Sequence, residues 1–220
     1  MYFRMLLLIS FLLSCFGTRI YTMDIRFEPI PAKLPPAMRD VVQIAQDKLG
    51  FIWLASRGGL IRYDGYNHAI YRFSPDDPRS ISSNFINYIC SGASGNIWVG
   101  TIDGGLNKYD PATDTFTRYR HDPKDPGSIA NNLVLSLLED RSGDLWIGTP
   151  DGLSWLPADR QTAQSDSGVF LNFKPREMLQ GSDMLDQIWS IYEDADQDIW
   201  MGTLQGDILR FDRQSRQFIR

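Results

Sequence analysis

The sequence predicts an all-β fold, a β-propeller built of four-stranded antiparallel blades, and three observations predict it. A short motif around a tryptophan occurs four times, and these tryptophans are 45, 48 and 54 residues apart. Each period contains several short strand-like runs separated by turn residues. No period contains an amphipathic stretch of helical spacing, which excludes helical repeats of similar length. The four marker residues are Trp53, Trp98, Trp146 and Trp200.

Residues 1–23 have the features of a secretory signal peptide. Arg4 supplies a positive charge, and the apolar run 5–13 is too short to cross a bilayer. We therefore expect export and cleavage, with a buried N-terminal strand or helix as the alternative. The residues "LLSC" that end at Cys15 also resemble a bacterial lipoprotein box, so a lipid anchor at Cys15 stays open as a second form of processing.

Composition and charge narrow the class of protein. The 220 residues are 43% hydrophobic and 22% charged, which is ordinary for a soluble globular chain. A net charge of −5 argues against a nucleic-acid partner, because such binding needs an excess of Lys and Arg. Removal of Cys15 with the signal would leave Cys90 alone, as a packed thiol without an intramolecular disulfide. Export without disulfides fits a bacterial periplasm.

The remainder of the chain, 24–220, is predicted to be a partial propeller. Each unit begins with an apolar strand, continues through the tryptophan strand, and adds two more strands separated by turns. Two linkers, 74–84 and 121–132, repeat the same order of Pro, Pro, Ser-Ile and Asn. The predicted blades span about 36–74, 84–121, 132–174 and 187–220.

The repeated motif is interpreted as architecture. A wide, flat tryptophan can fill the space between two adjacent sheets. The Asp and Gly before it shape the first hairpin of the blade, and the glycine two residues after it leaves room for the next blade. A row of tryptophans that stack on a redox cofactor is the alternative, and it is disfavoured, so no cofactor is expected. The glycines after the tryptophan are Gly100, Gly148 and Gly202.

The stretch "GNIWVGTIDGGLNKYDPATDTFTRYRHDPKDPGSIANN" (95–132) resembles the two-component regulator propeller repeats, with weaker copies around it. The resemblance covers essentially the whole chain after the signal. It implies a propeller of roughly seven blades in the periplasm, followed by a membrane helix and a cytoplasmic histidine kinase or diguanylate cyclase. Because only four blades precede Arg220, we expect a truncated N-terminal part of such a sensor, anchored in the membrane in its full-length parent.

The loop after each tryptophan strand is the predicted ligand-binding region. In this kind of blade these loops and the linkers between blades are expected on one face, where loop tips can vary on a fixed scaffold. For each single residue, a solvated turn position is the competing interpretation. The expected ligand is an extracellular glycan or small molecule. The predicted ligand-binding residues are Arg57, Asp103, Asp151 and Gln205.

Nothing in the sequence predicts a catalytic residue or a metal site. The acids of "DADQD" (194–198) alternate as in a calcium loop, but the glycine and bidentate glutamate of that loop are missing, so a hairpin turn is favoured. His68 and His121 are isolated and are interpreted as surface residues. No Ser/His/Asp or Cys/His arrangement indicates a nucleophile.

Two functions from different classes remain open. The first is a periplasmic sensory input module that passes ligand binding to a downstream signalling domain or to a partner chain in the membrane. The alternative is an exported propeller enzyme, a lyase or a glycan-active protein, with its site on the loop face. A homodimer is a further open expectation. Missing neighbours should also leave Trp200 less covered than Trp98.

Overall fold

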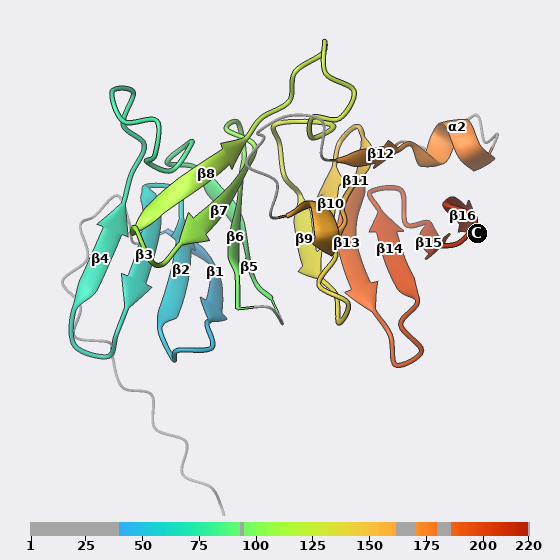
Figure 1. Cartoon of the computed structure of the whole chain (residues 1–220). Helices are drawn as coiled ribbons and strands as arrows, with labels where there is room; N and C mark the ends of the chain where they lie inside the picture. The colour runs from blue at the N-terminus through green and yellow to red at the C-terminus, as the bar shows by residue number, and fades with distance from the viewer. Residues whose placement is uncertain (1–39, 93–94, 162–169, 180–185, 220) are drawn as a thin grey trace, which may run out of the picture. The chain divides into compact units, whose positions relative to one another are not determined.

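The computed structural model describes residues 40–92, 95–161, 170–179 and 186–219. Within them, sixteen strands form four four-stranded antiparallel sheets, each with its strands in chain order (Figure 1). We call these sheets blades 1 to 4. The predicted all-β propeller architecture is confirmed. The predicted signal peptide and Cys15 lie outside the described residues.

The four blades have the same order of strands. Blade 1 contains β1 (Val41–Gln46), β2 (Ile52–Ser56), β3 (Gly59–Tyr63) and β4 (His68–Tyr71). Blade 2 contains β5 (Ile86–Ser91), β6 (Ile97–Thr101), β7 (Leu106–Asp110) and β8 (Thr115–Tyr119). Blade 3 contains β9 (Ser136–Glu139), β10 (Leu145–Thr149), β11 (Gly152–Leu156) and β12 (Leu171–Phe173). Blade 4 contains β13 (Ile188–Glu193), β14 (Ile199–Thr203), β15 (Ile208–Asp212) and β16 (Gln217–Ile219).

Blade 3 departs from the expected pattern in two places. The blade was predicted to start at about residue 132, but its first strand begins only at Ser136, because the backbone of Val134 pairs with blade 2 instead. The Val134 N–H donates to the Thr101 carbonyl at 2.9 Å, and the Val134 carbonyl accepts from Asn87 at 2.7 Å. Two short helical segments were also not predicted, η2 (Ala158–Arg160) and α2 (Pro175–Leu179).

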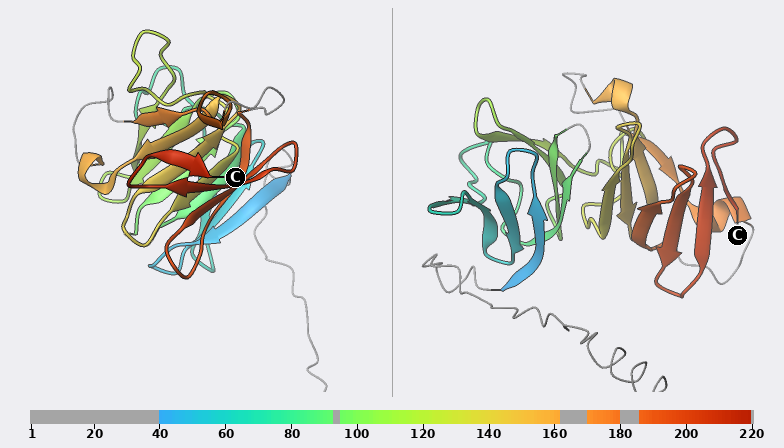
Figure 2. Two further views of the ribbon diagram at one scale, coloured as in Figure 1. Left: turned by 90° about the vertical axis from the view of Figure 1, so that its right-hand side faces the viewer. Right: turned by 90° about the horizontal axis from the view of Figure 1, so that it is seen from below.

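The hydrophobic core lies between successive blades. Trp53 of blade 1 packs with the buried side chains of blade 2, Trp98 of blade 2 packs with those of blade 3, and Trp146 of blade 3 packs with those of blade 4. All three indoles are fully buried. Figure 2 shows the four blades following one another in chain order. Trp53, Trp98 and Trp146 thus pack between sheets as predicted, whereas Trp200 of blade 4 is partly exposed.

The glycine two residues after the tryptophan was expected to let the next blade pack closely. A Cβ at Gly100 would lie 2.4 Å from Val134 Cγ1 of blade 3, and one at Gly148 would lie 2.4 Å from the Ile188 carbonyl oxygen of blade 4. At Gly202 the nearest atom would be Ser190 Oγ of the same blade. The expected inter-blade role is therefore found at the first two positions only.

The hairpin turn before each tryptophan needs one left-handed residue. Gly50, Gly95 and Gly143 take φ values of 90°, 90° and 85° there. In blade 4 the same position is Gln197, with φ 68°. A side chain with a Cβ is disfavoured in this region, so blade 4 has the least favourable first turn.

The repeated linkers form a second set of contacts between blades. Ile81 and Ile129 of the two Ser-Ile pairs are fully buried in the inter-blade cores. The Arg118 side chain of blade 2 donates to the carbonyls of Ser80 and Asp77, at 2.7 Å each. In blade 3, Asn172 makes the corresponding bond to the Ser128 carbonyl at 2.8 Å. Each linker is thus held by the outer strand of the following blade.

Blade 4 ends in an exposed apolar face. Trp200 is 37% exposed, and Tyr192 and Ile208 beside it are 66% and 67% exposed. Pairing across β13, β14 and β15 places Tyr192 opposite Trp200 and Gly202 opposite Ile208, so these side chains share one side of the sheet. The expectation that Trp200 is less covered than Trp98 is confirmed.

Candidate functional site

The four predicted ligand-binding residues lie on loops whose ends are held by hydroxyl groups. Thr101 Oγ1 donates to the Gly105 carbonyl at 2.8 Å and accepts from the Gly104 N–H at 2.9 Å. Ser56 and Thr149 make the same pair of bonds in blades 1 and 3, and Thr203 Oγ1 accepts from the Asp207 N–H. A Ser or Thr at this position in all four repeats was the available signal, and the sequence interpretation missed it.

These loops contact the linkers between blades, as expected for one loop edge. The Gly105 N–H donates to the Asn132 carbonyl at 2.9 Å, and the Ile102 N–H donates to the Phe85 carbonyl at 3.0 Å. Asn131 of the second linker donates to Asp151 at 2.7 Å. The second-to-third strand loops and the linkers therefore meet at the same ends of the strands, and we call this the loop edge.

The predicted residues themselves point outward from the loop edge. Arg57 pairs with Asp40 at 3.5 Å, both largely exposed, and such surface pairs contribute little to stability. Asp103 and Gln205 are exposed. Within the described ranges no hydrogen bond or ion pair joins any two of the four predicted residues, each of which belongs to a different blade. Their role in binding stays a prediction.

The opposite ends of the strands carry a second repeated polar arrangement, which we call the turn edge. The carboxylate six residues before the tryptophan accepts a hydrogen bond from the indole Nε1. Asp47 accepts from Trp53 at 2.8 Å, and Asp140 accepts from Trp146 at 2.6 Å. In blade 4, Asp194 accepts from Trp200 at 2.7 Å, which is the largest cause that lowers the pKa of Asp194. The predicted hairpin role of Asp194–Asp198 is thereby explained.

Blade 2 has no carboxylate at this position, since Gly92 occupies it. Trp98 Nε1 donates instead to Glu139 Oε2 of blade 3, at 2.9 Å. The glutamate enters the space that a side chain at residue 92 would fill: a Cβ at Gly92 would lie 2.1 Å from Glu139 Cδ. Blade 3 thus supplies the carboxylate that blade 2 lacks.

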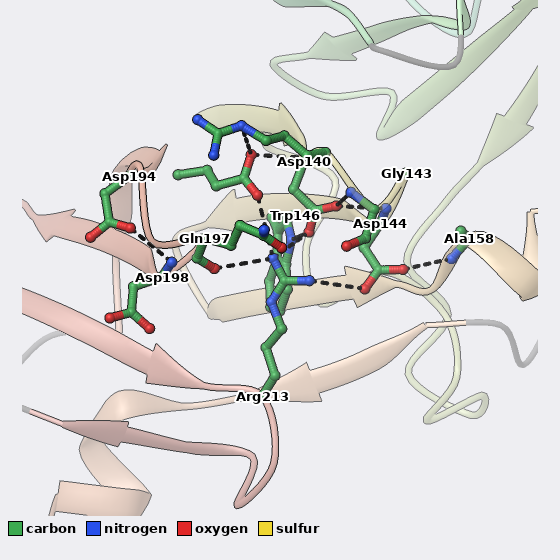
Figure 3. A network of polar contacts seen from close by, with 12 residues as sticks. Asp140, Gly143, Asp144, Trp146, Ala158, Asp194, Gln197, Asp198 and Arg213 are labelled. Atoms are coloured by element: carbon green, nitrogen blue, oxygen red, sulfur yellow. Dashed lines mark hydrogen bonds and ion pairs between the residues drawn. The ribbon is translucent and has the colours of Figure 1, made fainter.

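A charged network links blades 3 and 4 at the turn edge (Figure 3). Arg213, in the turn after β15, reaches Asp140 Oδ2 at 2.8 Å and Asp144 Oδ2 at 3.7 Å. Its guanidinium carbon lies 5.4 Å from the centre of the Trp146 ring, a cation–π contact. Glu193 lies 3.8 Å from the same guanidinium group, and Asp140 is fully buried. The buried acid is therefore neutralised by an arginine from the next blade.

The boundary between blades 1 and 2 carries a different polar arrangement, an arginine over aromatic rings with a carboxylate beside them. Arg62 lies over the rings of Phe51, Trp53, Tyr71 and Tyr109, between 5.0 and 5.8 Å from their centres. Asp114 accepts hydrogen bonds from Tyr71 at 2.7 Å and Tyr109 at 2.6 Å. Burial would raise the pKa of Asp114, but these bonds and Arg62 outweigh it and lower the pKa overall. The same burial and bonds raise the pKa of Tyr71 far above its usual range.

The remaining candidates are structural. Burial raises the pKa of the Cys90 thiol to about 11, in agreement with a packed thiol. His121 Nδ1 lies 2.8 Å from the Ile129 carbonyl, and His68 is partly exposed in β4. Among the described ranges, no three His, Cys, Asp or Glu side chains are placed to hold a metal ion. In the same ranges, the structure contains no helix with the length and hydropathy of a membrane span.

Comparison with known proteins agrees with this architecture. A family model described as two component regulator propeller matches residues 80–103, 128–151 and 184–205. Each match ends on the tryptophan strand and the loop that follows it. A protein described as histidine kinase P4, from Formosa agariphila, is 48% identical over 42 residues, which is 19% of this chain and 3% of that protein.

Solved structures share the fold. The extracellular domain of a hybrid two component system from B. thetaiotaomicron is 25% identical with a TM-score of 0.69, over 82% of this chain and 24% of that one. A second such domain from B. thetaiotaomicron, at 24% identity and a TM-score of 0.68, covers 82% of this chain and 25% of its own.

A virginiamycin B lyase from Staphylococcus aureus, at 15% identity and a TM-score of 0.55, covers 84% of this chain and 60% of its own. The last two likenesses show the fold alone. This chain spans about a quarter of the length of the two extracellular domains. Blades 2, 3 and 4 thus each contain a segment that matches the two component regulator propeller repeat.

Proposed function

We propose that this chain is the sensory input propeller of a bacterial two-component signalling protein, and that it binds an extracellular ligand at the loop edge. The observation that carries the proposal is the joint match of its repeats to the regulator propeller model and of its fold to an extracellular domain of a hybrid two component system. Export by the N-terminal signal, with a lipid on Cys15 as the variant form, would bring this edge into the periplasm.

The chemistry of the loop edge fits a polar ligand. The hydroxyl groups of Ser56, Thr101, Thr149 and Thr203 fix the ends of the loops, so the tips can differ without disturbing the sheets. Those tips present a guanidinium group, two carboxylates and an amide, at Arg57, Asp103, Asp151 and Gln205. Such groups donate to and accept from hydroxyls, which favours a glycan or another small polar molecule.

We further propose that the four blades belong to a longer parent with additional blades, a membrane anchor and a histidine kinase or diguanylate cyclase output domain. The exposed apolar face of blade 4 supports this, because a further blade would cover Trp200. Sequencing the gene beyond codon 220 tests this part directly. A stop codon at that point, with no partner gene for a membrane-bound output protein, would contradict it.

Ligand binding is tested on the purified chain with a panel of oligosaccharides, by thermal shift and calorimetry. Asp103→Ala and Asp151→Ala should each lower the affinity for the oligosaccharide about tenfold, since hydrogen bonds to charged groups are lost. Gln214→Ala, on the turn edge, is the matched control and should leave affinity unchanged. Equal affinities in all variants would contradict the loop edge as the site. Release of unsaturated products from a polysaccharide would favour the alternative, an exported lyase or glycan-active enzyme.

A further inference from the structure

We propose that Asp194, Asp198 and Trp200 form a slot for one arginine side chain, which a further β-sheet blade inserts when it packs on blade 4. We call these three residues the blade 4 slot. The inference rests on the proposed function, because the longer parent supplies that blade. It goes beyond it by naming the chemical group that the open face recognises.

The template is the occupied slot of blade 3. There Asp140 and Asp144 stand six and two residues before Trp146, and they receive Arg213 from blade 4. The guanidinium lies 2.8 Å from the Asp140 carboxylate and above the indole ring. Figure 3 shows this group between Asp140, Asp144 and Trp146, with Asp194 and Asp198 at the corresponding turn of blade 4.

The blade 4 slot repeats these residues at the same spacing. Asp194 and Asp198 stand six and two residues before Trp200. Asp194 accepts the Trp200 indole N–H through Oδ2 at 2.7 Å, just as Asp140 accepts that of Trp146. The backbone N–H of Asp198 also donates to Asp194 at 2.9 Å, so the turn already has the geometry found in blade 3.

Blades 1 and 2 serve as internal comparisons. Blade 1 has Asp47 and Phe51 at the two slot positions, and blade 2 has Gly92 and Asn96. Arg213 stands three residues after Arg210, the cross-strand partner of Trp200. The residue at the same position is Pro111 in blade 2 and Ala158 in blade 3.

Neither of these two slots, which lack the paired carboxylates, is therefore followed by a basic residue at that position. The slot of blade 3, which has two carboxylates, is followed by Arg213 at that position. By this correspondence, the two carboxylates of blade 4 select a cation from the blade that follows.

The blade 4 slot is accessible to such a cation. Trp200 is 37% exposed and the Asp198 side chain 40% exposed, whereas Asp140 and Trp146 are fully buried. A cavity of about 370 Å³ opens beside Asp198 and Arg210. Asp198 now pairs with Arg210 of its own blade at 2.8 Å, a half-exposed pair of small energetic value. Asp144 shows that such a carboxylate can take two partners, since it contacts both Arg213 and the Ala158 N–H.

The test appends a second copy of residues 174–220 to the full chain, so that a blade carrying its own Arg213 follows blade 4. Urea unfolding is compared for this extended chain and for one with Arg213→Ala in the appended copy alone. We expect the alanine to raise the unfolding equilibrium constant about tenfold, because a charge-assisted contact is lost. In a background with both Asp194→Asn and Asp198→Asn, which removes the two carboxylates of the blade 4 slot, the same change should have less than a twofold effect. Arg213→Lys in the appended copy should fall between, since lysine keeps the charge but not the planar fork.

Each outcome bears on one part of the inference. An appended blade that stabilises the chain equally with arginine or alanine would overturn the arginine slot while leaving the longer parent intact. An appended blade that stabilises nothing in any variant would count against both the slot and the packing of a further blade. Dimers of the unextended chain that vanish when the blade is appended would show that a second copy occupies the face, which would overturn the proposed occupant.

Discussion

The indole of Trp98 in blade 2 donates its Nε1 hydrogen bond to Glu139 of blade 3, whereas the other three marker tryptophans donate to an aspartate of their own blade. Gly92 leaves the space that the Glu139 side chain enters, so the contact between Trp98 and Glu139 joins blade 2 to blade 3. The stability of blade 2 therefore depends on blade 3 through a specific buried contact.

This relationship predicts a rescue. Glu139→Ala should lower the free energy of unfolding by about 1–3 kcal/mol, because the buried indole N–H loses its acceptor. Gly92→Asp alone should also destabilise the chain, since its Cβ would overlap Glu139. The double variant should be more stable than either single one, because it restores the arrangement found in blades 1, 3 and 4. A double-mutant cycle by urea denaturation measures this, and simple additivity would contradict the prediction.

The tryptophans should differ in their energetic weight. Trp98→Ala should cost about 3–5 kcal/mol, as other large-to-small core changes do. Trp200→Ala should cost less, because its indole is 37% exposed while that of Trp98 is fully buried. Denaturation of the two variants under identical conditions decides the matter. Equal losses would mean that another surface covers Trp200 in solution.

The hairpin turn of blade 4 can be improved. Gln197 holds φ 68°, where the other three blades have glycine at φ 85–90°. Gln197→Gly should therefore stabilise the chain by about 0.5–1 kcal/mol, as relief of left-handed strain exceeds the added entropy of glycine in the unfolded state. The reverse change, Gly143→Gln, is the control and should destabilise. A lower melting temperature for Gln197→Gly would contradict this account of the turn.

Acid should loosen the boundary between blades 1 and 2. The pKa of Asp114 is lowered in the fold, so its contribution is complete above the unfolded value near 3.8 and is lost as the pH falls through the lower folded pKa. Between about pH 4 and pH 2, the wild-type chain should lose stability more steeply than Asp114→Asn. Thermal melts at a series of pH values provide the measurement, and parallel curves would contradict the assignment.

Local patterns in the sequence predict most of the fold. The strand runs and the hairpin glycines depend on neighbours within one repeat, and the regular recurrence of the tryptophans identifies the repeats as blades. The replacement of an aspartate by Glu139 could not be predicted in this way, because Gly92 and Glu139 lie in different periods and only the packed sheets bring them together. The shortened β9 has the same origin, since the Val134 backbone bonds to blade 2.

For the candidate site, the sequence predicts where the loops lie but not the contacts that hold them. The loops that carry Arg57, Asp103, Asp151 and Gln205 follow from the repeat, and the hydroxyl residue that holds each loop recurs in all four repeats, a signal that the prediction did not use. The slot occupied by Arg213 was not predictable from one blade, because its acids and its arginine belong to successive repeats. Contacts between repeats need three-dimensional packing to be assigned.

The contact between Trp98 and Glu139 also limits how this architecture can grow by gene duplication. The residue of blade 2 that corresponds to Glu139 is Ser91, since each pairs with the residue before the tryptophan. A tandem copy of blade 2 would therefore place a short hydroxyl where the first copy's indole needs a carboxylate. Blade 4, with Glu193 at that position, could follow blade 2 without this loss. The blades are thus ordered units rather than interchangeable modules, and shuffling them would be selected against wherever a donor and its acceptor were inherited apart.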